Sequence, residues 1–417
     1  MTQHISRYHA RSAGLSLIEL MIAMVIGVLL LLGLVQTMSA SRAAYQLSAG
    51  VARTQENARF AMDYLQRDLR MAGHLGCVND QARMQPNAEG VNLLFMTDAQ
   101  RLAGNYPAGP FAGRFDMGIQ GFEATGTAPN QGVNLPSGDP TVAANANSWS
   151  PALPGTLFND IEPVAGSDII VMRYFSPVGA SLASFVANGT ATSTVTPEPA
   201  LADVTTSAQA TGLFGVSDCT HASVFAGAVD PGTGAVTVNS GASELNKSNF
   251  SGEEIYQPSQ AVLYRAEAVV YYVGIGASGE DPALFRARFE SNGAGGFNTA
   301  SEELVEGVES LQLLYGGDDQ TNPALRPTGY ISRSNVASAI GGGVANPSNL
   351  QATDWRRVGS VQIGLLMRSS ERAAAQQADA DINALSVLDV QMTAPQDGYY
   401  RSVYENTVAL RNRLFGN

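Results

Sequence analysis

An unbroken apolar run near the N-terminus constrains the fold of this chain more than any other feature. About 21 residues from Leu15 to Val35 contain a single charge, Glu19, and a helix of that length spans roughly 32 Å, enough to cross the hydrocarbon core of a membrane. A carboxylate inside such a segment costs roughly 2.5 to 3.5 kcal/mol near a bilayer centre. The sequence therefore predicts a membrane-spanning helix whose one acid serves a purpose other than insertion.

The residues before the run predict its orientation. Residues 1–14, MTQHISRYHARSAG, contain Arg7 and Arg11 but no acid. Because positively charged flanks stay in the cytoplasm, we expect a cytoplasmic N-terminus and export of the chain that follows the run.

Three kinds of processing fit this N-terminus to different degrees. A cleaved secretory signal would use Ser39–Ser41 as its cleavage site, but its apolar region is normally 7 to 15 residues long, shorter than this run. An uncleaved anchor fits the length and leaves Glu19 unexplained. Cleavage between Gly14 and Leu15 would expose a new amine about one helical turn from Glu19. A carboxylate paired with an ammonium group in a packed bundle is tolerated in lipid, so the third alternative accounts for the acid.

The helical pattern continues beyond the apolar run. No proline occurs before Pro86, and Gly73 and Gly76 are plausible helix stops. Apolar residues recur at three- and four-residue spacing with charges between them: Ala58, Met62, Leu65 and Leu69. The pattern predicts one helix from Leu15 to about Ala72, whose second half is amphipathic and packs against a globular part.

The remainder of the chain reads as antiparallel strands between loops rich in Gly, Ser and Asn. Strands are expected to begin near Ser167, Gly234, Ala261, Ala283, Arg356 and Ser402. The segment from Ser301, SEELVEGVESLQLLYG, begins with a weak helix signal and ends as a strand. Residues 100–160 and 176–215 are low in charge and are predicted to be long surface loops.

Composition excludes some classes of partner and site. The chain has a net charge of -13 and no basic cluster, so no nucleic acid is expected as a partner. The two cysteines, Cys77 and Cys219, cannot form a four-ligand zinc site unaided. If the chain is exported they are expected to form a disulfide; otherwise they are two buried thiols.

No pattern of catalytic residues is present in the sequence. His74 and His221 accompany no G-x-S-x-G or H-E-x-x-H motif, and we predict neither a catalytic role nor a cofactor. His74 is expected near the C-terminal end of the helix dipole. Asp318 and Asp319 lack the spacing of a calcium loop and are predicted to lie in a solvated turn, so no metal is expected. Paired tyrosines are interpreted as core and rim residues of strands: Tyr271, Tyr272, Tyr399 and Tyr400.

The stretch GLSLIEL resembles the class III signal of type IV pilins and of type II secretion pseudopilins. In that family a prepilin peptidase cuts after the glycine and methylates the new N-terminus, and the conserved glutamate lies five residues into the mature chain. Gly14, Leu15 and Glu19 occupy those positions. The resemblance implies that Leu15 is methylated and that Glu19 pairs with the methylated amine of a neighbouring subunit, fixing the axial register of the filament.

A longer stretch, RTQENARFAMDYLQRDLRMAGHLGC from Arg53 to Cys77, is similar to the PilW family of minor pilins. The similarity resumes at VSDC, ELVEGVESLQLLYG, WRRVGSVQIGLLMRS and TVALRNR. It implies that Cys77 and Cys219 are paired, and that the fold is a pilin-like α+β fold, with a long N-terminal helix packed on an antiparallel sheet domain with long loops. Four segments are expected: a leader peptide (1–14), a transmembrane or filament-core helix (15–35), its amphipathic continuation (36–76) and an extracytoplasmic β-rich domain (77–417).

The resemblance also implies a function without catalysis. PilW proteins are minor pilins of a complex that primes pilus assembly and stays near the tip, supporting adhesion and twitching motility. The implied partners are other minor pilins, the major pilin, a tip adhesin, the prepilin peptidase and, before assembly, the inner membrane. Many major pilins have a proline where this chain has Gln36, which argues against a major-pilin role. The alternatives are a J-type pseudopilin of type II secretion and a membrane-anchored periplasmic enzyme.

Overall fold

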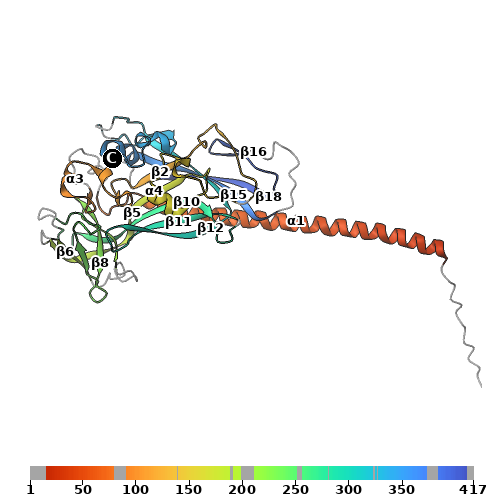
Figure 1. Ribbon diagram of the computed structural model, residues 1–417, viewed down its shortest axis with the longest axis horizontal. Coiled ribbons are helices and arrows are strands. Elements are labelled where there is room, and N and C mark those ends of the chain that lie inside the picture. The colour runs from red at the N-terminus through yellow and green to blue at the C-terminus, as the bar shows by residue number, and fades with distance from the viewer. Residues whose placement is uncertain are drawn as a thin grey trace, which may run out of the picture.

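The protein consists of a long helix and a β-rich body. The second half of the helix is embedded in the body, and the first half projects from it (Figure 1). The computed structural model describes residues 16–78, 91–138, 140–187, 191–198, 211–250, 256–279, 281–322, 325, 327–372 and 384–410. Helix α1, Leu17–Met71, is one continuous helix of 55 residues. It is long and apolar enough, by length and composition, to cross a membrane.

Helix α1 ends where the sequence predicted. Its last residue is Met71, one position before the expected Ala72, and the Ala72 amide closes the final turn on Asp68 and Leu69. Gly73 follows with a φ of +76°, a conformation that only glycine adopts at little cost, and its amide donates to the carbonyl of Arg173. The glycine thus ends the helix and turns the chain onto the sheet.

The largest of the three sheets has 11 strands. Its strands run in the order β12-β11-β10-β7-β8-β9-β6-β5-β2-β4, with β1 added in parallel to β8 and β10 also paired to β5. The bounds are β1 Val91–Leu93, β2 Ile119–Ala124, β4 Trp149–Ser150, β5 Ile169–Ala187, β6 Thr192–Pro197, β7 Thr211–Ser217, β8 Ala222–Val229, β9 Val236–Asn239, β10 Val262–Ile275, β11 Pro282–Ser291 and β12 Phe297–Glu306.

Part of this sheet closes on itself at the end of the body far from the free end of α1 (Figure 1). The pairings β5–β6, β6–β9, β9–β8, β8–β7, β7–β10 and β10–β5 are all antiparallel and form a ring. Its strands share a separate buried cluster that includes Leu182, Val195, Phe214, Phe225 and Leu263. Closure leaves no unpaired backbone edge within the ring, which we call the distal barrel.

Two smaller sheets complete the body. The four-stranded sheet is antiparallel in the order β14-β13-β15-β18, and the three-stranded sheet has the order β16-β17-β3, with β17 and β3 parallel. The bounds are β3 Gly132–Asn134, β13 Val308–Asp318, β14 Ile331–Asn335, β15 Val358–Arg372, β16 Ala384–Val387, β17 Val390–Thr393 and β18 Tyr399–Ala409. Short helices lie between strands: α3 Asp98–Leu102, α4 Gly155–Ile161 and α5 Asn349–Arg356.

The amphipathic half of α1 contributes one layer of the main core. Ala58, Met62, Leu65 and Leu69 are buried, as their spacing predicted. They pack in one cluster with residues of β5, β10, β13, β15 and β18: Ile170, Tyr271, Leu313, Leu365 and Val408, among others. The α+β architecture expected from the sequence, with a long N-terminal helix on antiparallel sheet, is therefore confirmed.

Two predictions about the body are wrong. Ser301 does not start a helix, because it lies inside strand β12, which pairs with β11; the end of the same segment is strand β13, as predicted. The predicted loops 100–160 and 176–215 contain β2, α4, the second half of β5, β6 and part of β7. In 176–215 the small and hydroxylated residues suit strands of the distal barrel: alternate residues of β6 are buried, and six consecutive residues of β7 are buried, so low charge reflects burial as much as loop composition.

Candidate functional site

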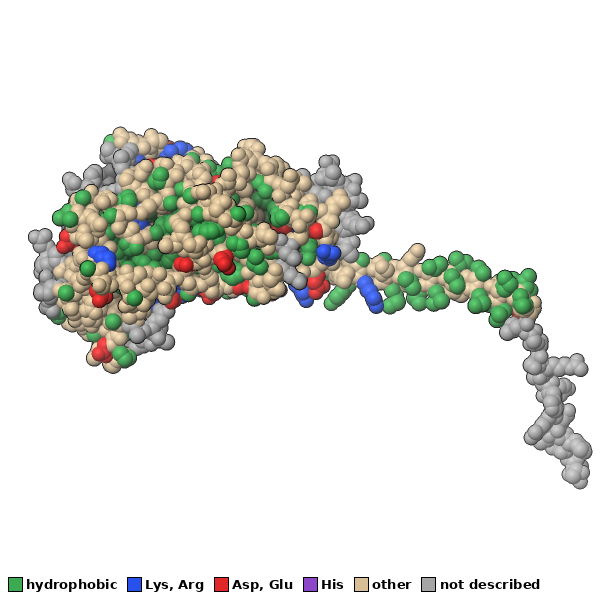
Figure 2. Space-filling model, in the orientation of Figure 1, with side chains coloured by type: hydrophobic (Ala, Val, Ile, Leu, Met, Phe, Trp, Pro, Cys, Tyr) green, Lys and Arg blue, Asp and Glu red, His purple; other side chains and the backbone are tan. Residues whose placement is uncertain are grey.

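The first half of α1 presents an apolar surface that nothing in the body covers. Every large apolar side chain from Leu17 to Val35 is more than half exposed, with Leu17 at 77% and Leu30 at 70%. Figure 2 shows these side chains surrounding the projecting helix, well clear of the body. Because apolar side chains exposed all round a helix are stable only in lipid or against protein, this surface is completed by one or the other.

Glu19 is the only charged residue on that surface. It lies in the first turn of α1 and is exposed. An acid in the first turn interacts favourably with the positive end of the helix dipole. Gly14 and Leu15, between which cleavage is predicted, lie outside the described residues, so the pairing of Glu19 with an amine stays a prediction.

Polar contacts fix the second half of α1 in its orientation on the sheet. The Tyr271 hydroxyl on β10 donates to Asp68 Oδ2 at 2.7 Å, and Arg286 on β11 reaches the same oxygen at 3.4 Å. Arg286 also donates to Glu302 on β12 at 2.7 Å. Burial and the negative charge of Asp68 raise the pKa of Tyr271, which keeps its hydroxyl protonated as a donor. Asp68 thus joins α1 to two strands through a buried carboxylate.

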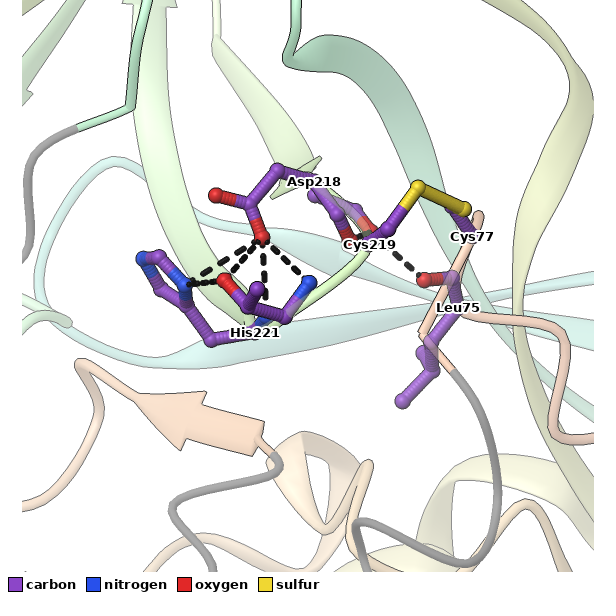
Figure 3. The surroundings of a disulfide bond; sticks show 7 residues. Leu75, Cys77, Asp218, Cys219 and His221 are labelled. Carbon is purple, nitrogen blue, oxygen red and sulfur yellow. Dashed lines mark hydrogen bonds and ion pairs between the residues drawn. A yellow bond between two sulfur atoms is a disulfide. The ribbon is translucent and has the colours of Figure 1, made fainter.

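A disulfide joins the end of the helix to the body (Figure 3). Cys77 and Cys219 are bonded, with their Cα atoms 4.6 Å apart and a sequence separation of 142. Both cysteines are exposed, and Ser217 Oγ donates to the Leu75 carbonyl beside them at 2.9 Å. The predicted disulfide is confirmed, and it lies where the chain passes from helix to sheet.

The loop that carries Cys219 is held in shape by Asp218. Its Oδ1 accepts hydrogen bonds from the amides of Thr220 and His221 at 2.7 and 2.8 Å, and from the Thr220 hydroxyl at 2.7 Å. The His221 ring stacks on Tyr256 with centroids 4.5 Å apart, and its Nδ1 lies 3.2 Å from the same oxygen (Figure 3). These contacts give Asp218 and His221 a structural role in presenting the disulfide.

The structure also places the histidine, the tyrosines and the aspartates that the sequence analysis named. Burial lowers the pKa of His74, whose ring meets Tyr264 edge-on at 6.1 Å. Tyr271 and Tyr272 lie in the core. The prediction of a solvated turn is wrong for Asp318, which is buried and accepts bonds from the amides of Gln320, Thr328 and Gly329, whereas Asp319 is exposed. Tyr399 and Tyr400 are half-buried in β18.

A buried pair of acids, which no sequence pattern indicated, lies between the two larger sheets. Asp168 accepts hydrogen bonds from the amide of Ala124 on β2 and from that of Leu313 on β13, each at 2.8 Å. Glu123 lies beside it, 5% exposed, and its Oε2 has no hydrogen-bond partner among the described residues. Burial and then the charge of Asp168 raise the pKa of Glu123 to about 9, so Glu123 is protonated at neutral pH.

The described residues join an exposed apolar helix to a folded body. Within the described part of the chain no group of three or more His, Cys, Asp or Glu side chains is placed to hold a metal ion. What the structure offers is an apolar rod rigidly joined to a folded body by a buried carboxylate and a disulfide.

Comparison with known proteins agrees with the family resemblance. Residues 270–412, from the middle of β10 to just beyond β18, match the family described as Type IV Pilus-assembly protein W (PilW). Residues 9–35, which include Gly14, Leu15 and Glu19, match the prokaryotic N-terminal methylation motif. No curated protein matches the chain in sequence. Among solved structures, the chain is similar to a type IV-like pilin from Thermus thermophilus, with 18% identity over 36% of this chain and 68% of that one and a TM-score of 0.19.

Proposed function

We propose that this chain, which contains a PilW domain and an N-terminal methylation motif, is a minor pilin of the type IV pilus. The observation that carries the proposal is the exposed apolar half of α1 with Glu19 in its first turn. A membrane accepts this helix before assembly, and neighbouring helices bury the same surface within a filament afterwards.

Processing prepares the N-terminus for transfer of the helix from the membrane into the filament. The prepilin peptidase cuts between Gly14 and Leu15 and methylates the new amine, which remains positively charged. In a packed bundle this amine of one subunit pairs with Glu19 of the next, because two opposite charges in lipid cost less together than apart. The pair selects one axial position for each entering subunit.

The body suits a position near the tip of the pilus. The body holds the large sheet with its distal barrel and two further sheets. Residues 36–269, which include most of the distal barrel, lie outside the two family matches. A body of this size fits best where no identical subunit has to stack above it. There it would take part, with other minor pilins, in priming assembly, and would support adhesion and twitching motility together with a tip adhesin.

The test compares incorporation of variants into the pilus in the native host. Glu19→Val is expected to leave membrane insertion unchanged and to lower the amount of the chain in sheared pili at least about tenfold, since a buried amine would be left unpaired. Glu244→Val, which removes an exposed acid from the body, away from helix α1, is the control. Normal incorporation of the Glu19 variant removes the proposed role of Glu19.

Two further measurements separate this function from its alternatives. Intact mass of the membrane-extracted chain should show loss of residues 1–14 and one added methyl group. Absence of the chain from sheared pili, together with a defect in protein secretion when it is deleted, would instead identify a J-type pseudopilin.

A further inference from the structure

The second half of α1 has an exposed face opposite to its buried one, and that face is rich in arginine. Exposed residues follow one another at spacings of three and four, so they form one stripe along the helix. We call this stripe, with Arg59 beside it, the arginine seam: Arg53, Glu56, Arg59, Phe60, Asp63, Arg67 and Arg70. It extends for about 26 Å at the helical rise of 1.5 Å per residue.

The described part of the body provides no ion pair for two arginines of the seam, Arg59 and Arg67. Arg53 lies 3.9 Å from Glu371, but both side chains are about two-thirds exposed or more, and such a pair contributes little. Arg70 donates to Gln66 at 3.3 Å. Four arginines against two acids therefore give a positive stripe on a chain whose net charge is -13.

An aromatic side chain lies in the middle of this positive stripe. Phe60 is 52% exposed, although the opposite face of the same turns is closely packed in the core. Arginine and aromatic residues are the side chains enriched in the centres of protein interfaces. Phe60, with Arg59 and Arg67 near it, therefore has the surroundings of an aromatic residue that anchors a protein interface.

We propose that the arginine seam binds an acidic helix of a different pilus subunit, with Phe60 as its apolar anchor. The inference rests on the proposed function, because a partner helix that lies along residues 17–35 reaches the seam if it extends past residues 36–52. Spacings of three and four suit near-parallel helix packing. A second copy of this chain would bring the same net positive stripe against the seam at any register, so the complementary partner is acidic and distinct.

Site-specific photocrosslinking in the full-length chain tests this seam. Phe60→p-benzoylphenylalanine in the native host, followed by irradiation of cells and mass spectrometry of the adducts, reports what lies against Phe60. The expected product is an adduct with another subunit that carries the N-terminal methylation motif. The same probe at Tyr330, which is 73% exposed on the body, is the positional control and should give no such adduct.

Charge variants test why the partner binds. Combined Arg59→Glu and Arg67→Glu should reduce the adduct about tenfold or more, whereas Arg59→Lys with Arg67→Lys should retain most of it. Both arginines are exposed, so neither pair of changes should alter folding. An adduct with a second copy only, with lipid only, or one that survives charge reversal would overturn the proposal. If the chain is in sheared pili but gives no adduct at position 60, the seam proposal fails and the minor-pilin function stands.

Discussion

Replacing Glu123 with glutamine should make the stability of this protein less dependent on pH. The pKa of Glu123 rises from 4.5 in the unfolded chain to about 9 in the fold, because the group is buried beside Asp168. The folded state therefore holds a proton that the unfolded state releases above pH 4.5. Stability is greatest below that pH and falls as the pH rises towards 9.

The size of the effect follows from the same shift. Each pH unit between these two pKa values costs about 1.4 kcal/mol, so the parent chain should lose at most about 4 kcal/mol between pH 5 and pH 8 through this group. Burial also raises the pKa of Asp168 to about 7, so this neighbour adds a pH dependence of its own that the variant retains. Glu123→Gln has nearly the same shape and no proton to lose. Compared with its parent, the variant should therefore gain stability steadily as the pH is raised.

Urea unfolding of the detergent-solubilised chain at pH 5, 6, 7 and 8 measures the difference directly. Glu162→Gln, the same change at an exposed glutamate, is the control and should follow the parent at every pH. A difference between the Glu123 variant and its parent that stays constant with pH would show that Glu123 is ionised in the fold, and the reasoning would be wrong.

Two further predictions concern the junction of helix and body. Cys77→Ser with Cys219→Ser should lower the free energy of unfolding by about 2 to 5 kcal/mol, measured by urea unfolding without reductant; a parent chain insensitive to reductant would contradict it. Asp68→Ala should cost about 3 kcal/mol or more, because Tyr271 and Arg286 lose their shared buried acceptor. Hydrogen exchange should then rise in residues 54–71 while the distal barrel stays protected, and uniform loosening would argue against a local role.

Periodicity made the helix and several of the long strands predictable, such as β10 and β15. Ala58, Met62, Leu65 and Leu69 have no role except to face the core, so their spacing could be read directly. The prediction of a helix start at Ser301 failed because the glutamates of edge strand β12 resemble the first turn of a helix. Only the pairing of β12 with β11 decides the conformation.

The site was predictable only where its chemistry is local. Glu19 is conspicuous because its neighbours are all apolar, and two cysteines allow one pairing within the chain. Glu123 and Asp168 could not be found, since residues 45 apart become a pair only when β2 and β5 meet. The arginine seam was visible as charges between apolar positions, but whether anything covers those charges depends on the body.

The position of the disulfide has a mechanical consequence. A pull along α1 is carried first by the packed half of the helix, and Cys77 lies six residues after the last helical residue, Met71. The covalent bond passes tension that reaches Cys77 straight to the turn between β7 and β8, so the chain between the two cysteines, whose sequence separation is 142, is bypassed. Load applied at one end of the molecule thus reaches the distal barrel without having to unravel the strands between.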